Sequence, residues 1–396
     1  MSLIQTPSAN RVHIGFFGRR NAGKSSLVNA VTGQALSVVS DTPGTTTDPV
    51  RKAMELLPLG PVLIIDTPGF DDEGALGALR VQKTREILRE ADIAVLVVDA
   101  TQGITGADEE LIALFKENGT PFIVAMNRCD LGNAQCTMHN AQLVECSALT
   151  GENIHALKEA IARLAPQKEE RRLLSDLLSP GDCAVLVTPI DTAAPRGRLI
   201  LPQQQVLRGA LDAGAYALVT KETELPAALA RLNAPPGLVI TDSQVFGLVA
   251  GVVPEDVPLT SFSILFARYK GFLKAAVDGV EALRHLPAGS SILIAEGCTH
   301  HRQCDDIGTV KLPRWIQENL HRTFAFSFCS GNEFPQDLSP YALVLHCGGC
   351  MLNEKTMRAR AAIAAAQGVP LTNYGICIAW LQGILDRCLQ PFKGRY

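Results

Sequence analysis

The chain carries, at residues 18–25, the run Gly18-Arg19-Arg20-Asn21-Ala22-Gly23-Lys24-Ser25, which matches the pattern G-x-x-x-x-G-K-S. An apolar stretch, residues 13–17, precedes the run and predicts a buried strand, and a helical pattern follows it. Strand, glycine-rich loop and helix in this order are the context in which the pattern binds phosphate. We predict that Lys24 contacts the β- and γ-phosphates and that Ser25 ligates Mg²⁺. The residues predicted to bind nucleotide here are Gly18, Asn21, Ala22, Gly23, Lys24, Ser25 and Ser26.

Three further motifs indicate that the base is guanine. They are Asp66-Thr67-Pro68-Gly69, Asn127-Arg128-Cys129-Asp130 and Ser147-Ala148-Leu149. Asp66 is the expected Mg²⁺ ligand, and the amide of Gly69 faces the γ-phosphate. The second motif resembles N-K-x-D, in which Asp130 accepts hydrogen bonds from guanine that adenine cannot donate. The third resembles the S-A-x loop that contacts guanine O6. We therefore add Asp66, Gly69, Asn127, Asp130, Ser147 and Ala148 to the predicted GTP-binding residues.

The four motifs together resemble those of small bacterial GTPases of the TrmE–Era group. Residues 44–48, Gly-Thr-Thr-Thr-Asp, are similar to switch I of that group, with Thr46 as a Mg²⁺ ligand. Asn21 matches a P-loop asparagine that binds K⁺ in potassium-stimulated members; a loop residue that tolerates a left-handed backbone is the alternative. Phe70 stands where many GTPases have a water-orienting glutamine. The resemblance implies slow GTP hydrolysis that K⁺ accelerates, with the catalytic residues Lys24, Thr46 and Gly69.

Alternating strand-length apolar runs and helical patterns divide the chain into three α/β segments. Residues 11–165 fit a doubly wound sheet, and the charged residues 166–180 indicate a linker or a connecting helix. Two further β–α alternations predict two smaller α/β domains with mainly parallel sheets. The middle one has short strands whose free edges favour pairing with a second copy. We expect domains at 1–167 for GTP binding, 168–267 for dimerisation and 268–396 for metal binding.

Composition excludes several classes of protein. A net charge of −4 without a block of like charges argues against nucleic acid recruited through bulk electrostatics. The longest apolar runs have strand length, so no membrane span is expected, and the N-terminus lacks an apolar signal core. Eleven cysteines, an odd number with uneven spacing, do not resemble a secreted disulfide framework. We expect a cytoplasmic protein.

Two short Cys/His clusters near the C-terminus predict a site for a soft metal. The first contains Cys298 and His300, and the second contains His346, Cys347 and Cys350. Both follow predicted strands, so they are expected at the same edge of one sheet. The chemistry alone leaves three possibilities open: an iron–sulfur cluster, a structural zinc site and a C-x-x-C redox pair. With three thiols on a 4Fe–4S cluster, the candidates for a fourth ligand are His300, His346 and Asp305.

The whole arrangement resembles the HydF family of FeFe-hydrogenase maturation GTPases. The similar phrases lie at residues 194–203, 261–271 and 298–308, and the likeness extends from about residue 10 to about residue 390. It implies a homodimeric scaffold that binds a 4Fe–4S cluster through Cys298, Cys347 and Cys350. It also implies that a diiron precursor of the hydrogenase active site is assembled with radical SAM maturases and delivered to the apo FeFe-hydrogenase. The alternative is a TrmE–Era-like RNA- or ribosome-associated GTPase with a structural zinc site. That alternative predicts a KH-like domain or a basic patch, and the sequence shows neither.

Overall fold

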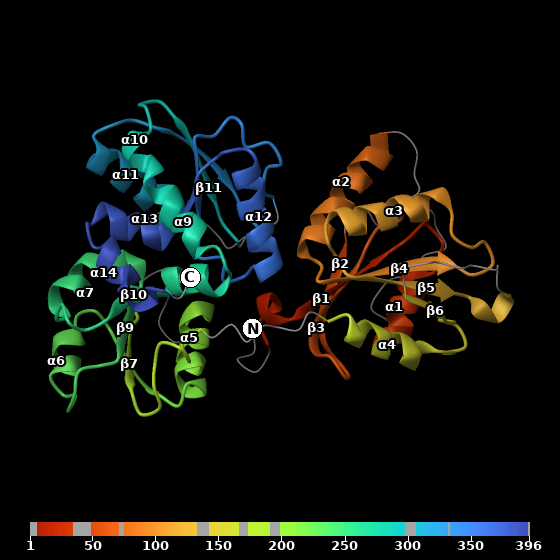
Figure 1. Ribbon diagram of the computed structural model, residues 1–396, viewed down its shortest axis with the longest axis horizontal. Helices are drawn as coiled ribbons and strands as arrows, with labels where there is room; N and C mark the ends of the chain where they lie inside the picture. The colour runs from red at the N-terminus through yellow and green to blue at the C-terminus, as the bar shows by residue number, and fades with distance from the viewer. Residues whose placement is uncertain are drawn as a thin grey trace. The chain divides into compact units, whose positions relative to one another are not determined.

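The structure is a computed structural model of the chain (Figure 1). It describes residues 6–34, 49–70, 75–132, 142–165, 173–190, 199–297, 306–331 and 333–394. The chain forms two compact units, Met1–Lys168 and Glu169–Tyr396, which we call unit 1 and unit 2. Within the described ranges, no helix has the length and apolar character needed to span a membrane.

Unit 1 is built around a six-stranded sheet with the order β2-β3-β1-β4-β5-β6. Its strands are β1 (Val12–Phe17), β2 (Val50–Leu56), β3 (Gly60–Asp66), β4 (Ile93–Asp99), β5 (Phe122–Asn127) and β6 (Gln142–Glu145). Its helices are α1 (Lys24–Thr32), α2 (Ala75–Glu90), α3 (Gly106–Glu117) and α4 (Ile154–Arg163), with 3₁₀ turns η1 (Ser8–Asn10) and η2 (Cys129–Leu131). All neighbouring strands except β2 and β3 run parallel. The carboxyl ends of the parallel strands therefore meet at one edge, where ligands collect in such sheets.

Apolar side chains cover both faces of this sheet, as its uninterrupted apolar runs predict. In Figure 1, α1 and α4 lie against one face, and α2 and α3 lie against the other. The core on the first face includes Leu27 of α1 and Ile161 of α4, and the core on the second includes Ile87 of α2 and Phe115 of α3. The P-loop GTPase fold expected from the sequence is therefore present.

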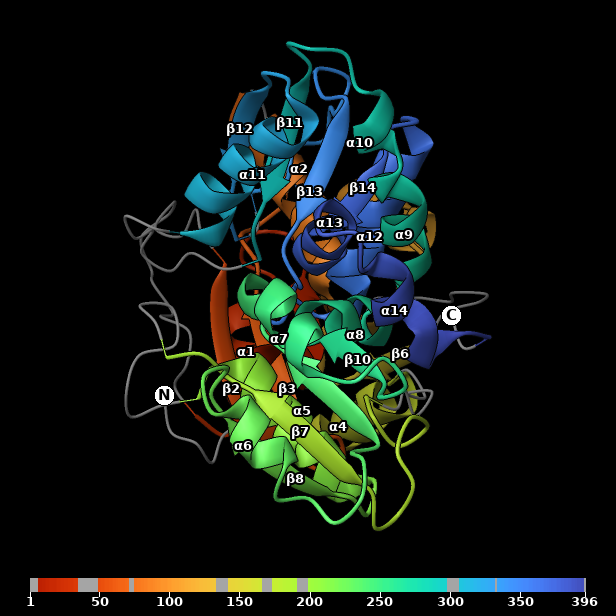
Figure 2. The ribbon, with the colours of Figure 1, turned by 90° about the vertical axis from the view of Figure 1, so that its left-hand side faces the viewer.

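Unit 2 contains two four-stranded parallel sheets, with the orders β10-β9-β7-β8 and β12-β11-β13-β14. The strands are β7 (Cys183–Val187), β8 (Tyr216–Thr220), β9 (Leu238–Thr241), β10 (Leu259–Ser261), β11 (Ser291–Ala295), β12 (Ala325–Cys329), β13 (Leu343–His346) and β14 (Leu371–Asn373). The helices are α5 (Leu201–Asp212), α6 (Leu225–Leu229), α7 (Phe246–Val252), α8 (Phe262–Tyr269), α9 (Leu273–Val280), α10 (Ala282–His285), α11 (Leu312–Leu320), α12 (Glu354–Ala366), α13 (Tyr374–Leu381) and α14 (Leu385–Leu389). Shorter turns are η3 (Ser243–Val245), η5 (Gln390–Phe392) and the π-helical η4 (Ile307–Lys311). Figure 2 shows α8 between the two sheets, and one continuous apolar core joins them.

The two sheets of unit 2 have the same topology. In each, the first strand pairs with the second and the third, and the fourth strand pairs with the third. The fourth strand then leads directly into a helix, β10 into α8 and β14 into α13. Residues 260–271 and 372–383 correspond in this arrangement and read TSFSILFARYKG and TNYGICIAWLQG. Both stretches end at a glycine with a left-handed backbone, at φ 76° for Gly271 and 71° for Gly383. Unit 2 is therefore an internal repeat.

Two features of the fold differ from the pattern in the sequence. β2 was not predicted, because its side chains are mostly exposed at the sheet edge and no apolar run marks it. It makes the sheet of unit 1 mixed rather than wholly parallel. In the stretch expected to be a linker, Leu174 and Leu178 are buried in the core of unit 2. The C-terminal part of that stretch therefore belongs to unit 2, while residues 166–172 lie outside the described residues.

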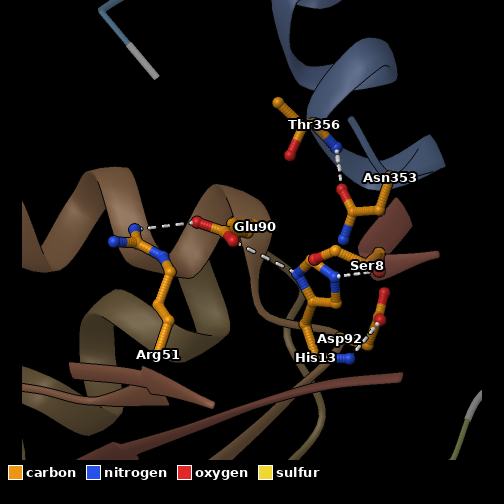
Figure 3. A network of polar contacts seen from close by, with 7 residues as sticks. All are labelled: Ser8, His13, Arg51, Glu90, Asp92, Asn353 and Thr356. Atoms are coloured by element: carbon orange, nitrogen blue, oxygen red, sulfur yellow. Dashed lines mark hydrogen bonds and ion pairs between the residues drawn. The ribbon is translucent and has the colours of Figure 1, made fainter. Parts of the chain in front are cut away.

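A polar network near the start of β1 connects three segments of unit 1 (Figure 3). Nδ1 of His13 lies 3.3 Å from Oε1 of Glu90, and Oε2 of Glu90 lies 3.1 Å from Nη2 of Arg51. Nε2 of His13 lies 2.9 Å from the carbonyl oxygen of Ser8, and the His13 amide donates to Asp92 at 2.8 Å. Glu90 ends α2 and Arg51 lies in β2. The network therefore ties the end of a helix to the edge strand.

We expect Glu90→Gln to lower the free energy of unfolding by about 1 kcal/mol at neutral pH. Burial raises the pKa of Glu90, but the His13 and Arg51 contacts outweigh it and hold the pKa below its ordinary value. Because the folded pKa is lowered, the carboxylate's contribution is complete above the unfolded-state pKa and is lost as pH falls through the folded value. Urea unfolding at neutral pH and at about pH 3 measures this effect. A difference between variant and wild type that stays constant at acid pH would contradict the assignment.

Candidate functional site

The loop between β1 and α1 has the geometry of a phosphate-binding loop. Gly18 has φ 146°, and a Cβ there would lie 2.3 Å from the carbonyl oxygen of Val97, so only glycine fits. Gly23 caps α1 with φ 83° and leaves no space for a Cβ beside Asn127. The ammonium of Lys24 donates to the carbonyls of Gly18, at 3.0 Å, and Arg19, at 2.6 Å. The loop therefore curls around a buried cation at the N-terminus of a helix, where anions bind favourably.

The two Mg²⁺ ligands predicted within the described residues lie side by side. Oγ of Ser25, in the first turn of α1, donates to Oδ2 of Asp66 at the end of β3, at 2.8 Å. The other carboxylate oxygen of Asp66, Oδ1, is buried and has no hydrogen-bond partner. An unpaired buried carboxylate oxygen is costly unless a cation binds it. This oxygen pair fits Mg²⁺, which prefers oxygen ligands. Thr46, the third predicted ligand, lies outside the described residues.

Asn127 links the phosphate-binding loop to the predicted guanine loop. Its Nδ2 donates to the carbonyl of Ala22 at 3.2 Å, and its Oδ1 accepts from the amide of Ala148 at 3.0 Å. Ser147 is fully buried, and its Oγ accepts from the amide of Thr150 at 3.2 Å. The three motifs, which are distant in the sequence, therefore meet at the carboxyl edge of the sheet of unit 1.

The guanine motif departs from N-K-x-D at Arg128, and the structure gives this arginine a partner. Arg128 has a left-handed backbone, and its Nη1 donates to Oδ2 of Asp99 at 2.6 Å. Asp99 ends β4, so the pair fixes the loop that presents the exposed Asp130 in η2. The sequence analysis did not single out Asp99. An acidic residue at the end of a strand next to an unusual arginine was the available signal.

Gly69 and Phe70 follow β3 and contact the phosphate-binding loop. A Cβ on Gly69 would lie 2.9 Å from the amide nitrogen of Arg20, so no larger residue fits there. The amide of Phe70 donates to the carbonyl of Gly18 at 3.3 Å. The Phe70 side chain is 7% exposed and packs in the core with Phe17. It therefore points away from solvent and cannot orient a water molecule.

The second candidate site lies at the carboxyl end of β13 in unit 2. Cys347 follows this strand, and its Sγ accepts hydrogen bonds from the amides of Gly297, at 3.1 Å, and Gly349, at 3.4 Å. Burial raises the pKa of the Cys347 thiol, and these two amides oppose the rise. Gly349 has φ 65°, and a Cβ there would lie 2.7 Å from Sδ of Met357. Backbone amides that converge on a sulfur suit a thiolate ligand of a metal.

The thiol of Cys350 has a different setting. Burial raises its pKa to about 12, the nearby Cys347 adds to the rise, and the ammonium of Lys270 opposes it. Lys270 is 2% exposed, and its ammonium lies 5.5 Å from the ring centroid of Tyr269. Two adjacent buried thiols with raised pKa values stay protonated unless a metal displaces the protons. The thiols therefore fit a soft metal ion or cluster better than they fit a reactive redox pair.

Arg360, in α12, holds the imidazole of His346. Nη1 of Arg360 lies 2.8 Å from Nε2 of His346, and Nδ1 of His346 lies 2.8 Å from the carbonyl oxygen of Cys347. Burial, with the Arg360 cation, lowers the pKa of His346 to about 3. Arg360 also donates to the carbonyl of Gly331, and its guanidinium lies 5.0 Å from the ring centroid of Phe334. The imidazole is therefore neutral and fixed in place.

Three residues near the thiols were not singled out in the sequence. Glu296, at the end of β11, is 8% exposed, and its Oε1 accepts from the hydroxyl of Tyr374 at 3.2 Å. A Cβ on Gly308 would lie 2.6 Å from the same carboxylate oxygen. The amide of Glu296 donates to the carbonyl of Cys329 on the edge strand β12. A buried carboxylate directly before the first Cys/His cluster was the available signal.

The remaining predicted metal-site residues, Cys298, His300 and Asp305, lie outside the described residues. Within the described ranges, no group of three His, Cys, Asp or Glu side chains lies close enough to hold a metal ion. The structure thus brings together His346, Cys347 and Cys350 and leaves the partners from the preceding loop undescribed. The first four residues of that loop's copy in the repeat, after β7, include Thr188 and Ile190, so the ligands are specific to the second copy.

Family comparisons identify unit 2. Residues 173–271 match the family model of the hydrogen maturase F dimerization domain, and residues 274–391 match that of the hydrogen maturase F tetramerization domain. The chain belongs to the HydF family. Residues 13–128 also match the model of a 50S ribosome-binding GTPase, in agreement with the fold of unit 1. The HydF resemblance in the sequence is therefore confirmed.

Similar curated proteins match the N-terminal part of the chain. GTPase Der of Natranaerobius thermophilus is 36% identical over 166 residues, which are 40% of this chain and 38% of the relative. The tRNA modification GTPase MnmE of Synechococcus sp. (strain JA-3-3Ab) is 34% identical over 179 residues, which are 44% of this chain and 38% of the relative. The chain thus spans about two fifths of the length of these relatives.

Solved structures with a similar fold include Aquifex aeolicus Era bound to GDP and AlF4⁻. The two chains are 23% identical, with a TM-score of 0.35, and the match covers 56% of this chain and 98% of Era.

Proposed function

We propose that this protein is a GTPase scaffold that binds a 4Fe–4S cluster, and that it assembles and delivers the diiron precursor of the FeFe-hydrogenase active site. The observation that carries the proposal is the pairing of two buried thiols at the end of β13 with the two HydF family models over unit 2. The corresponding domains are 1–167 for GTP binding, 168–267 for dimerisation and 268–396 for cluster binding.

In unit 1, GTP and Mg²⁺ occupy the edge where the phosphate and guanine loops meet. Ser25, Thr46 and Asp66 ligate Mg²⁺, while Lys24, Thr46 and the amide of Gly69 stabilise charge on the γ-phosphate. The orphaned Oδ1 of Asp66 supports this assignment. Hydrolysis is slow, because the buried Phe70 leaves no side chain at that position to orient the attacking water.

We expect GTP hydrolysis in KCl to be about tenfold faster than in NaCl, which corresponds to about 1.4 kcal/mol of transition-state stabilisation. Asn21 has φ 62° and lies at the tip of the phosphate-binding loop, where a side-chain oxygen can reach a cation beside the phosphates. Steady-state phosphate release measures the ratio, and Asn21→Ala should abolish it. Equal rates in the two salts would leave Asn21 as a residue needed only for the left-handed backbone.

In unit 2, Cys298, Cys347 and Cys350 hold three irons of the cluster. His300, His346 or Asp305 supplies the fourth ligand or supports the site. The cluster supplies an iron with an exchangeable position, and the protein supplies thiolates, backbone amides on sulfur and a buried environment. Three cysteines suit a scaffold, because a cargo must be accepted and released.

Self-association of unit 2 follows the free edges of its two sheets. β8 and β12 are equivalent edge strands in the repeat, and both alternate exposed with half-buried side chains. Tyr216 and Val219 on β8 are 55% and 41% exposed, and Phe328 on β12 is 38% exposed. Exposed apolar side chains on a free edge favour pairing with another chain. We assign β8 to the homodimer contact.

The partners follow from the family. Radical SAM maturases supply the diiron precursor, and apo FeFe-hydrogenase receives it. All eight cysteines within the described ranges are free thiols, which suits the reducing cytoplasm. The similarity to Der and MnmE is confined to the GTPase part, so an RNA- or ribosome-associated role leaves unit 2 unexplained.

The proposal is tested by anaerobic reconstitution of the full chain with iron and sulfide. We expect a brown protein with about four irons per chain and, after reduction, the EPR signal of a 4Fe–4S cluster. A colourless protein that holds one zinc per chain would instead establish the structural-zinc alternative. Reconstituted iron that remains after removal of any one of the three cysteines would also contradict it.

A further inference from the structure

The hydrogen bonds of His346 define its tautomer. An arginine guanidinium only donates hydrogen bonds, so Nε2 of His346 must accept the bond from Nη1 of Arg360 at 2.8 Å. The ring proton therefore sits on Nδ1, which donates to the carbonyl oxygen of Cys347 at 2.8 Å. Both ring nitrogens are thus engaged in hydrogen bonds, and neither presents a free lone pair to a metal.

The internal repeat shows that the contact through Nδ1 belongs to the fold. Thr241, at the end of β9, corresponds to His346 at the end of β13, because each ends the third strand and pairs with the last residue of the fourth strand. Oγ1 of Thr241 donates to the carbonyl of the following residue, Asp242, at 3.2 Å. The copy without the thiol pair therefore makes the same bond from the same position. The role of this side chain is to fix the turn after the strand.

Arg360 is itself held firmly. It is 3% exposed, it donates to the carbonyl of Gly331, and its guanidinium lies over the ring of Phe334. If Nε2 of His346 turned to iron, this buried guanidinium would lose a hydrogen bond that no water could replace. The ring of His346 is also fully buried and lies edge-on to Phe272, at 6.4 Å between centroids. Coordination by His346 therefore requires several packed groups to move.

We propose that Arg360 is a positioning residue that keeps His346 out of iron coordination, so that the fourth iron position stays open for an exchangeable ligand. This inference rests on the proposed function, and it assigns His346 to support of the site. Arg360 and His346 together brace the backbone of Cys347 from behind. The fourth ligand then comes from solvent, from the cargo or from the loop before η4.

The first experiment uses the apoprotein and needs no cluster. In full-length protein labelled with ¹⁵N-histidine, NMR should show His346 with a protonated Nδ1 and an unprotonated Nε2, and His346→Phe assigns its signals by difference. Arg360→Met, which keeps a similar volume but has no donor, should shift the Nε2 resonance, whereas Arg360→Lys should keep an accepting Nε2. A protonated Nε2 in the wild type would overturn the proposal, and this arm stands even if Arg360→Met fails to fold.

The second experiment uses the same labelled proteins reconstituted with iron and sulfide and then reduced. Pulsed EPR of the wild type should show no strong coupling of the cluster to an imidazole ¹⁵N of His346. In Arg360→Met the coupling should appear, and it should disappear again in Arg360→Met with His346→Phe. A coupling in the wild type that is lost in His346→Phe would overturn the proposal. If no variant assembles a cluster, the proposed function fails, while the NMR result still decides whether Arg360 holds His346.

Discussion

Replacing Lys24 with alanine is expected to lower kcat/KM for GTP hydrolysis by about 10³-fold. The Lys24 ammonium lies inside the phosphate-binding loop and donates to the carbonyls of Gly18 and Arg19. Bound phosphates would exchange these carbonyls for oxygens whose negative charge grows in the transition state. Because the side chain is only 8% exposed, water cannot substitute for the missing cation.

Steady-state phosphate release with saturating Mg²⁺ and K⁺ measures this loss. Lys116→Ala is the matched control, since Lys116 is an exposed lysine of α3 on the same unit, and its rate should stay within about twofold of the wild type. Thermal unfolding of both variants separates a lost cation from a lost fold. A Lys24→Ala protein that folds and hydrolyses GTP at the wild-type rate would show that another nucleotide site is responsible.

The sequence predicted most of the strands because buried parallel strands leave uninterrupted apolar runs. β4 and β5 are covered on both faces, and their runs could be recognised directly. β2 could not be recognised, since its exposed edge position places no constraint on apolar residues. The same reasoning explains the repeat in unit 2. Residues 260–271 and 372–383 share only a few identities, so the shared strand order had to come from the structure.

The nucleotide site was predictable to a greater degree than the second site. Its residues occur in short motifs whose spacing is determined by strand, loop and helix. The neighbours of the thiols come from elements far apart in sequence: Glu296 ends β11, Arg360 lies in α12 and Lys270 follows α8. No local spacing connects these residues to Cys347 and Cys350. Their buried charges become visible only when the tertiary structure places them together.

Replacing Cys350 with alanine is expected to reduce bound iron from about four atoms per chain to below about one after anaerobic reconstitution. Cys350 is the better test than Cys347, because the Cys347 sulfur also accepts two backbone hydrogen bonds that support the turn. The Cys350 thiol stays protonated without a metal, since burial raises its pKa to about 12. Its loss therefore removes a ligand and leaves a small cavity, with no buried charge left unpaired.

Cys183→Ala is the matched control for this variant. Cys183 is a 5% exposed thiol on β7, in the copy of the repeat that carries no metal motif, so the substitution removes the same atom at a similar depth. It should retain the full iron content and the EPR signal of the wild type. Both variants should unfold within a few degrees of each other, because each loses one buried sulfur. A Cys350→Ala protein with four irons and an unchanged signal would remove this cysteine from the cluster, and with it the argument from the paired thiols.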